Sequence, residues 1–256
     1  MCLIVFSIRK EKQAAGLDPK YSYTLLANRD EYYDRPTTQM DWWRDKEILA
    51  GQDNLAGGTW LGVARDGRFA AITNFKEDIS GRDFRYSRGE LVINYLESIN
   101  TMGRDYLESI NGENYAGFNL LVGDAFGIHS YSNRRKGIIT LKEGTHALGN
   151  CFLNSETSKV IRVKEDFDEL YASNMNVEKA FEMMVMESGD LKIINKYDLK
   201  DNDFEEIPFR FITSEFYGTR CTTLLSILQD GKISVHEQTY LKKGVIGPRK
   251  DFKFLS

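Results

Sequence analysis

An apolar run that ends in a dense polar cluster is the feature that most constrains this chain. Residues 23–27 are Tyr-Thr-Leu-Leu-Ala, which favours a β-strand, and residues 28–36 continue as Asn-Arg-Asp-Glu-Tyr-Tyr-Asp-Arg-Pro. A second strand-like run, residues 3–8, starts directly after Cys2. We expect the two strands to pair in the middle of one sheet, because pairing would bring Asp30 close to Cys2. The sequence therefore predicts a polar site at the N-terminal strand.

The composition fits one domain over residues 1–256 and argues against several functions. The net charge of −4 gives no sign of a basic face for nucleic acid. No apolar segment approaches the roughly 20 residues that span a bilayer. The cysteines Cys2, Cys151 and Cys221 are sparse, odd in number and without zinc spacing. This pattern favours a reduced, cytoplasmic protein.

The order of the predicted elements favours an α+β fold. Asp66-Gly67 indicates a hairpin between residues 57–64 and 68–74, and Ser87 with Glu90 forms a capping-box pattern that opens a helix. Further helices are expected over 103–110, from 154 to 171 and over 177–185, strands over 116–122, 126–131, 137–141, 208–214, 219–228 and 232–241, and loops over 75–87 and 194–206. Strands and helices thus come in separate runs, which predicts two stacked sheets between two helical layers, an αββα sandwich.

Motifs spread over nearly the whole chain together resemble the NRDE family, also called the transport-and-Golgi-organisation-2 family. They are Met1-Cys2, Leu26–Glu31, Asp34–Pro36, Leu49–Gly51, Gly57–Gly62, Ile72–Asn74, Ser87–Gly89 and Phe216–Arg220. This resemblance by itself implies no particular reaction.

A more distant resemblance, to the choloylglycine-hydrolase and penicillin-acylase branch of the N-terminal nucleophile (Ntn) hydrolases, implies an αββα fold and a chemistry. It matches Cys2 to the nucleophile, Asn28–Asp30, Thr73-Asn74 and Leu148–Asn150 to three turns, and Arg220 to a late arginine. One departure is Ala27, which stands where those hydrolases usually carry an arginine. Arg29 lies inside the motif instead, and we expect it to point the other way on an alternating strand.

The resemblance implies a role for each matched residue, and each has a plainer alternative. Cys2, once Met1 is removed, would attack a carbonyl with its own α-amine as base; alternatively it fills a strand end as a small hydrophobe. Asp30 would hold the amine or thiol, or would simply cap a turn or pair with a nearby arginine. Asn74 and Asn150 would donate to an oxyanion, or are ordinary turn residues. Arg220 would lower the thiol pKa, or forms a structural ion pair.

Asn28, Arg29 and Trp60 are the expected substrate-binding residues. Trp60 has an alternative, because Gly57–Trp60 also fits a tight turn with the indole anchored in the core. His129, His146 and His236 show no metal spacing, so neither a metal nor another cofactor is expected.

The sequence thus favours hydrolysis of an amide or thioester through Cys2. The alternative is a carrier that uses the same cleft for a hydrophobic small molecule, such as haem or an acyl-CoA or other lipid, with a role in lipid or haem homeostasis. A third possibility is a protein-interaction scaffold, which the dense polar motif makes less attractive. The oligomeric state stays open.

Overall fold

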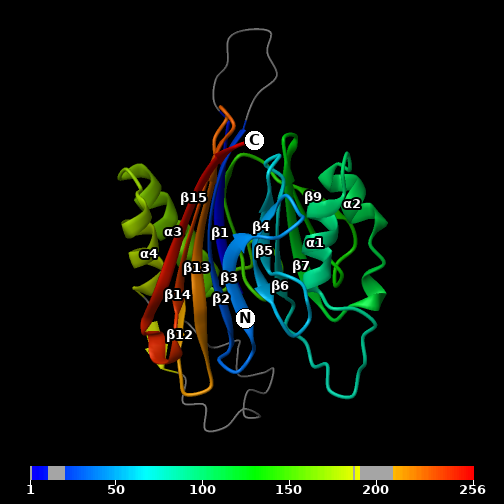
Figure 1. Cartoon of the computed structure of the whole chain (residues 1–256), viewed down its shortest axis with the longest axis horizontal. Coiled ribbons are helices and arrows are strands. Elements are labelled where there is room, and N and C mark those ends of the chain that lie inside the picture. Colours follow the sequence, from blue (N-terminus) through cyan, green and yellow to red (C-terminus); the bar gives the residue numbers. More distant parts are fainter. Residues whose placement is uncertain (1, 11–20, 187, 191–209) are drawn as a thin grey trace.

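The computed structural model, described over residues 2–10, 21–186, 188–190 and 210–256, has four layers (Figure 1). Two antiparallel sheets stack face to face. Helices α1 (Gly89–Glu97) and α2 (Gly103–Ser109) cover the outer face of one sheet, and α3 (Ser158–Ala172) and α4 (Val177–Val185) cover the other. The expected αββα sandwich is confirmed.

The first sheet carries the N-terminal strand. Its members are β1 (Cys2–Lys10), β2 (Tyr21–Tyr32), β10 (Gly144–Leu148), β13 (Tyr217–Ile227), β14 (Lys232–Tyr240) and β15 (Ile246–Leu255). Their order is β10-β1-β2-β13-β14-β15, so β1 and β2 lie in the interior of the sheet as predicted. The two strands are antiparallel, with Cys2 opposite Arg29.

The second sheet follows the chain in sequence order from β3 to β9. Its members are β3 (Thr37–Trp42), β4 (Ile48–Asp53), β5 (Leu61–Ala64), β6 (Phe69–Asn74), β7 (Phe118–Asp124), β8 (Gly127–Ser132) and β9 (Ile138–Thr140). The predicted hairpin joins β5 to β6: Gly67 has a φ of +86°, which its turn requires. A short parallel pair, β11 (Ser188–Asp190) and β12 (Phe211–Thr213), completes the strands.

The core between the sheets forms because side chains alternate along each strand. On β1, Ile4 and Phe6 face the second sheet, whereas Leu3 and Val5 pack beneath α3 and α4. The same alternation places the residues of β2 on two opposite faces, which decides what each residue of the polar cluster can reach.

Several sequence-based boundaries are wrong. Ser87 caps no helix, because α1 has no side-chain cap and the Glu90 carboxylate instead accepts a hydrogen bond from Tyr115 at 2.7 Å. Asn154 does not open α3; its side chain accepts from the Ala147 N–H at 3.0 Å. Strands β3 and β15 were not expected, and the predicted loop over 194–206 lies outside the described residues.

Candidate active site

Cys2 lies at the edge of a polar pocket between the two sheets. Its half-buried side chain shares the face of β1 that carries Ile4, and this face looks toward the second sheet. The pocket has a volume of about 130 Å³. It is lined by Cys2, Arg29, Asp30, Glu31, Arg35, Asp53, Thr59, Trp60, Ile72, Asn74, Ser87, Arg88 and Gly89. The structure therefore brings together Cys2, Asp30, Asn74, Arg29 and Trp60 among the predicted site residues.

Arg29 points into this pocket, so the expectation that it points away from the face of Ala27 is wrong. Residues two apart on a strand share a face, and Ala27 lies in the core between the sheets. The Arg29 guanidinium carbon lies 4.4 Å from the centroid of the Trp60 ring. Arg29 thus connects β2 of the first sheet to Trp60, next to β5 of the second sheet, by a cation–π contact.

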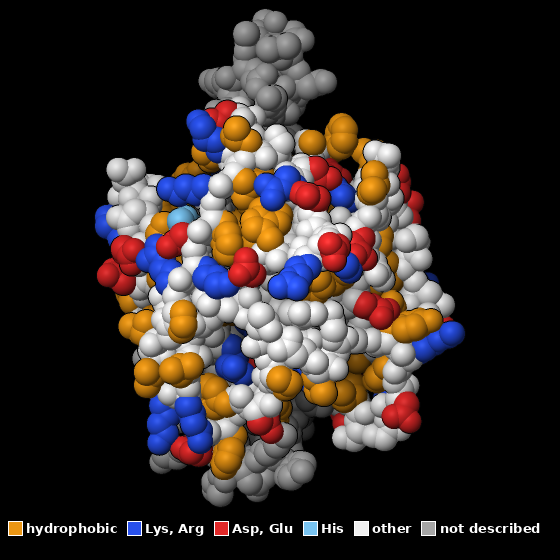
Figure 2. All heavy atoms as spheres, in the orientation of Figure 1, with side chains coloured by type: hydrophobic (Ala, Val, Ile, Leu, Met, Phe, Trp, Pro, Cys, Tyr) orange, Lys and Arg blue, Asp and Glu red, His pale blue; other side chains and the backbone are white. Residues whose placement is uncertain are grey.

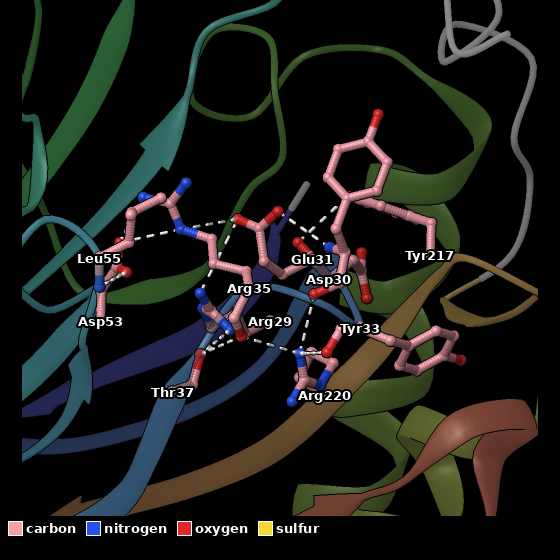
Figure 3. A network of polar contacts seen from close by, with 11 residues as sticks. Arg29, Asp30, Glu31, Tyr33, Arg35, Thr37, Asp53, Leu55, Tyr217 and Arg220 are labelled. Atoms are coloured by element: carbon pink, nitrogen blue, oxygen red, sulfur yellow. Dashed lines mark hydrogen bonds and ion pairs between the residues drawn. The ribbon is translucent and has the colours of Figure 1, made fainter. Parts of the chain in front are cut away.

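A chain of alternating charges runs along the pocket wall (Figure 3). Glu31 lies between two arginines, 3.8 Å from Arg29 and 4.0 Å from Arg35. Arg35 in turn forms a 2.6 Å ion pair with Asp53, at the end of β4. Burial opposes ionisation of Asp53, but the hydrogen bonds and charge of Arg35 outweigh it and hold the Asp53 pKa below its usual range. This pair joins the turn after β2 to β4 of the second sheet.

Asp30 is almost completely buried and anchored by β13. Its Oδ1 accepts a hydrogen bond from the Thr219 hydroxyl at 2.7 Å, and its main-chain carbonyl accepts one from the Tyr217 hydroxyl at 3.1 Å. Burial raises the pKa of the Asp30 carboxyl, and the positive charge that most opposes this rise is Lys159. These bonds anchor Asp30 to β13, and Asp30 lines the same pocket as Cys2.

Asn28 does not line the pocket. It shares the face of β2 that is covered by helices, where its Nδ2 donates to the Arg210 carbonyl at 2.8 Å and to the Met184 carbonyl at 3.3 Å. Its Oδ1 accepts from the Thr222 hydroxyl at 2.6 Å. Strand alternation turns Asn28 toward α4, where it ties this layer to the sheet, so the structure does not bring it together with Arg29 and Trp60.

Arg220 lies against the turn that follows β2. Arg220 is the extra residue of a β-bulge between Thr219 and Cys221. A bulge changes the direction in which the extra side chain points relative to the regular strand. Its Nη1 donates to the Tyr32 carbonyl at 2.8 Å and to those of Tyr33 and Arg35 at 3.4 Å. Arg220 therefore secures the turn after β2 and is not among the residues that line the pocket with Cys2.

Asn74 and Asn150 lie together, but only Asn74 lines the pocket. The Asn150 Nδ2 donates to the main-chain carbonyl of Asn74 at 2.8 Å, and the Thr73 hydroxyl donates to the Gly149 carbonyl at 2.8 Å. The two predicted turns thus support each other. Asn150 therefore supports the main chain of Asn74 and is not itself among the residues that line the pocket.

The predicted site lacked Arg88, Arg35, Asp53 and Glu31, which the structure places in the pocket. Arg88 precedes α1, and its Nη1 donates to the Gly117 carbonyl at 3.0 Å. The signal that could have found it is the Ser87-Arg88-Gly89 motif, which lies far from Cys2 in sequence. Asp53 carries no local signal, because its place depends on packing between the sheets.

The surroundings of Cys2 raise the pKa of its thiol above the ordinary value. Burial raises its pKa, and the negative charges of Asp30 and Glu31 add to this, whereas Arg29 acts in the opposite direction. Cys221 lies on the other side of Arg29 in the same sheet, and burial raises its pKa well above the usual value. A reactive thiolate at Cys2 would therefore require a base.

The profile of the Transport and Golgi organisation 2 family matches residues 1–242. The chain belongs to this family. The Transport and Golgi organization protein 2 homologs of Bos taurus and Homo sapiens are each 30% identical to it, over 94% and 95% of this chain respectively and 94% of each relative. A solved structure, the Caenorhabditis elegans N-acylethanolamine-hydrolyzing acid amidase ortholog, aligns with a TM-score of 0.43 and 10% identity over 88% of this chain and 92% of that one.

The described part of this family member contains no helix that is long and apolar enough to cross a membrane. On the face shown in Figure 2, acidic and basic side chains are interspersed. The charge on that face is therefore mixed.

Proposed function

We propose that this protein is an Ntn-type hydrolase that cleaves an amide or thioester bond through Cys2. The observation that carries the proposal is the position of the Cys2 thiol, at the start of β1, in a pocket that also contains Asp30 and Asn74. Three arginines, Arg29, Arg35 and Arg88, line the same pocket, and none of these groups is adjacent to Cys2 in sequence.

The reaction would start when removal of Met1 turns the Cys2 nitrogen into an amine. The amine takes the thiol proton, and the sulfur attacks the carbonyl carbon to form a C–S bond and an oxyanion. The Asn74 side chain, on the opposite wall, is the candidate donor to that oxyanion. As the C–N or C–S bond to the leaving group breaks, the ammonium returns its proton to that group. Water then hydrolyses the acyl-enzyme, with the amine again as base.

The raised pKa of Cys2 gives this processing step its importance. An amide nitrogen cannot accept the thiol proton, so a chain that keeps Met1 holds an inert thiol. An α-amine has an ordinary pKa of about 7.7–8.0 and can accept it near neutral pH. Asp30, which lines the same pocket, would accept a hydrogen bond from the new amine and fix its orientation.

The alternative function, a carrier of a hydrophobic molecule, fits this pocket less well. Pockets for drug-sized ligands measure roughly 300–1,000 Å³ and are mostly apolar. The pocket at Cys2 measures about 130 Å³ and has charged walls. A small polar group near a scissile bond suits these dimensions better than a haem ring does.

The test is selective labelling of the processed protein with a thiol-directed acylating probe. We expect Cys2 to react faster than Cys151 or Cys221, because only Cys2 would have a base beside it. Cys2→Ser should abolish this fast labelling while leaving the melting temperature nearly unchanged.

The matched control is a chain with a one-residue N-terminal extension that keeps Met1 in place. Its Cys2 nitrogen stays an amide, so Cys2 should be labelled slowly. Equal, slow labelling of all three cysteines in protein whose mass confirms Met1 removal would refute the hydrolase. A carrier would then be the better account, and its ligand binding should survive Cys2→Ser.

A further inference from the structure

We propose that Arg88 forms a subsite for an anionic group of the ligand, a carboxylate or a phosphate, a few bonds from the position attacked by Cys2. The assignment of that attacked position rests on the proposed hydrolase function. The binding of the anion itself does not, and can be measured without turnover.

Arg88 is the pocket arginine that the protein leaves without a carboxylate. A guanidinium has five N–H donors. Within the described ranges its only hydrogen bond is the one from Nη1 to the Gly117 carbonyl, at 3.0 Å, and it forms no ion pair. Burial lowers its pKa, because the charged form loses hydration. An anion that reaches this guanidinium would replace the lost water with charge-assisted hydrogen bonds.

The other charges of the pocket are already matched. Arg35 pairs with Asp53 at 2.6 Å, and Arg29 lies 3.8 Å from Glu31. Asp30 also lines the pocket, but its carboxylate accepts a hydrogen bond from Thr219 of β13, the strand that pairs with β2 on the side away from β1. The positive charge that most lowers the pKa of Asp30 is that of Lys159. Among the described residues, Arg88 is therefore the pocket arginine with no carboxylate within ion-pair distance, although the charges of Glu31 and Glu77 act on it from further away. An anion at this guanidinium would complete its pairing.

The backbone around Arg88 is held in place by a close contact between two glycines. A Cβ built on Gly58 would lie 2.5 Å from the carbonyl carbon of Gly89, and the Thr59 N–H donates to the Gly89 carbonyl at 3.2 Å. The start of α1 is thus fixed against the segment before β5. A fixed backbone lets the guanidinium meet an anion with little rearrangement.

The geometry also limits where the anion lies relative to Cys2. Both side chains line a pocket of only about 130 Å³. A substrate would therefore carry its negative charge close to the scissile carbonyl, rather than at the far end of a long chain.

The experiment is calorimetric titration of the full chain that retains Met1, at constant ionic strength. The probes are N-acetylglycine, inorganic phosphate and the neutral N-acetylglycinamide. We expect at least one of the two anions to bind and Arg88→Gln to weaken it tenfold or more, because the charge is lost while a donor to the Gly117 carbonyl is kept. Arg88→Lys should recover much of the affinity. Arg85→Gln, at an exposed position of the same loop, is the matched control and should change nothing.

Preferential binding of N-acetylglycine or of phosphate would support the subsite and identify its anion. Three results would overturn it: no binding of either anion, equal binding of the neutral amide, or unchanged affinity in Arg88→Gln. Because these titrations involve no turnover, slow labelling of Cys2 would leave them valid. Conversely, a reactive Cys2 without anion binding would refute the subsite alone.

Discussion

Glu237, a buried carboxylate between the sheets, provides the sharpest test of how the pocket wall is held. It is 0% exposed on β14, and its Oε1 accepts a hydrogen bond from the Met40 N–H of β3 at 2.8 Å. Met40 lies at an irregularity in the pairing of β3 with β4, and Thr223 donates to the second Glu237 oxygen at 3.4 Å. The carboxylate thus ties the edge strand β3 to the first sheet.

Glu237→Ala should destabilise the protein by about 2–4 kcal/mol. Loss of the acceptor leaves the buried Met40 N–H unpaired, which costs about 1–3 kcal/mol. The cavity left by the removed side chain adds about 1 kcal/mol. Glu237→Gln keeps the volume and one carbonyl oxygen, so it should lose no more than about 1 kcal/mol at neutral pH.

The pH dependence has a definite sign. Burial raises the pKa of Glu237 in the folded protein. Between the ordinary carboxyl pKa and this raised value, the folded state binds more protons than the unfolded state, so the contribution of Glu237 to stability falls as the pH rises. Glu237→Gln does not titrate, and its stability relative to the natural chain should therefore improve as the pH increases through this interval.

Urea unfolding at several pH values measures both effects. With a slope of about 3 kcal/mol/M, Glu237→Ala should lower the midpoint by roughly 1 M while the slope stays unchanged. An alanine variant as stable as the glutamine variant would refute the role of Glu237 as the acceptor of the Met40 N–H. A stability difference between Glu237→Gln and the natural chain that does not change with pH would contradict the raised pKa of Glu237.

Two further substitutions test the supports of the site. Gly58→Ala should lower the melting temperature by about 3–10 °C through overpacking against Gly89 and should weaken anion binding at Arg88. Its control is Gly81→Ala, whose added methyl group would meet no atom within 4 Å; the φ of +72° there costs some stability, but anion binding should stay unchanged. Arg220→Gln should lower the melting temperature, because it loosens the turn after β2. The pH dependence of Cys2 labelling should stay unchanged. A shift of that pH dependence would instead show that Arg220 acts on the pKa of the Cys2 thiol.

The sequence by itself determined the αββα architecture and the strand pairing that brings Cys2 close to Asn28–Glu31. Both follow from local physics: alternating apolar residues form the strands, and Asp66-Gly67 supplies the positive φ that one hairpin requires. Once the strands at 3–8 and 22–27 are paired antiparallel, Cys2 has to lie close to residues 28–30, and it lies opposite Arg29.

Only the tertiary structure decided which side chains share the pocket with Cys2. Strand alternation turns Asn28 toward α4, and a one-residue bulge turns Arg220 toward the carbonyls after β2. Arg88 and Asp53 come from segments whose distance to Cys2 depends on how the two sheets stack. These placements depend on register and on packing between layers, and neither is encoded in the residues immediately around each site.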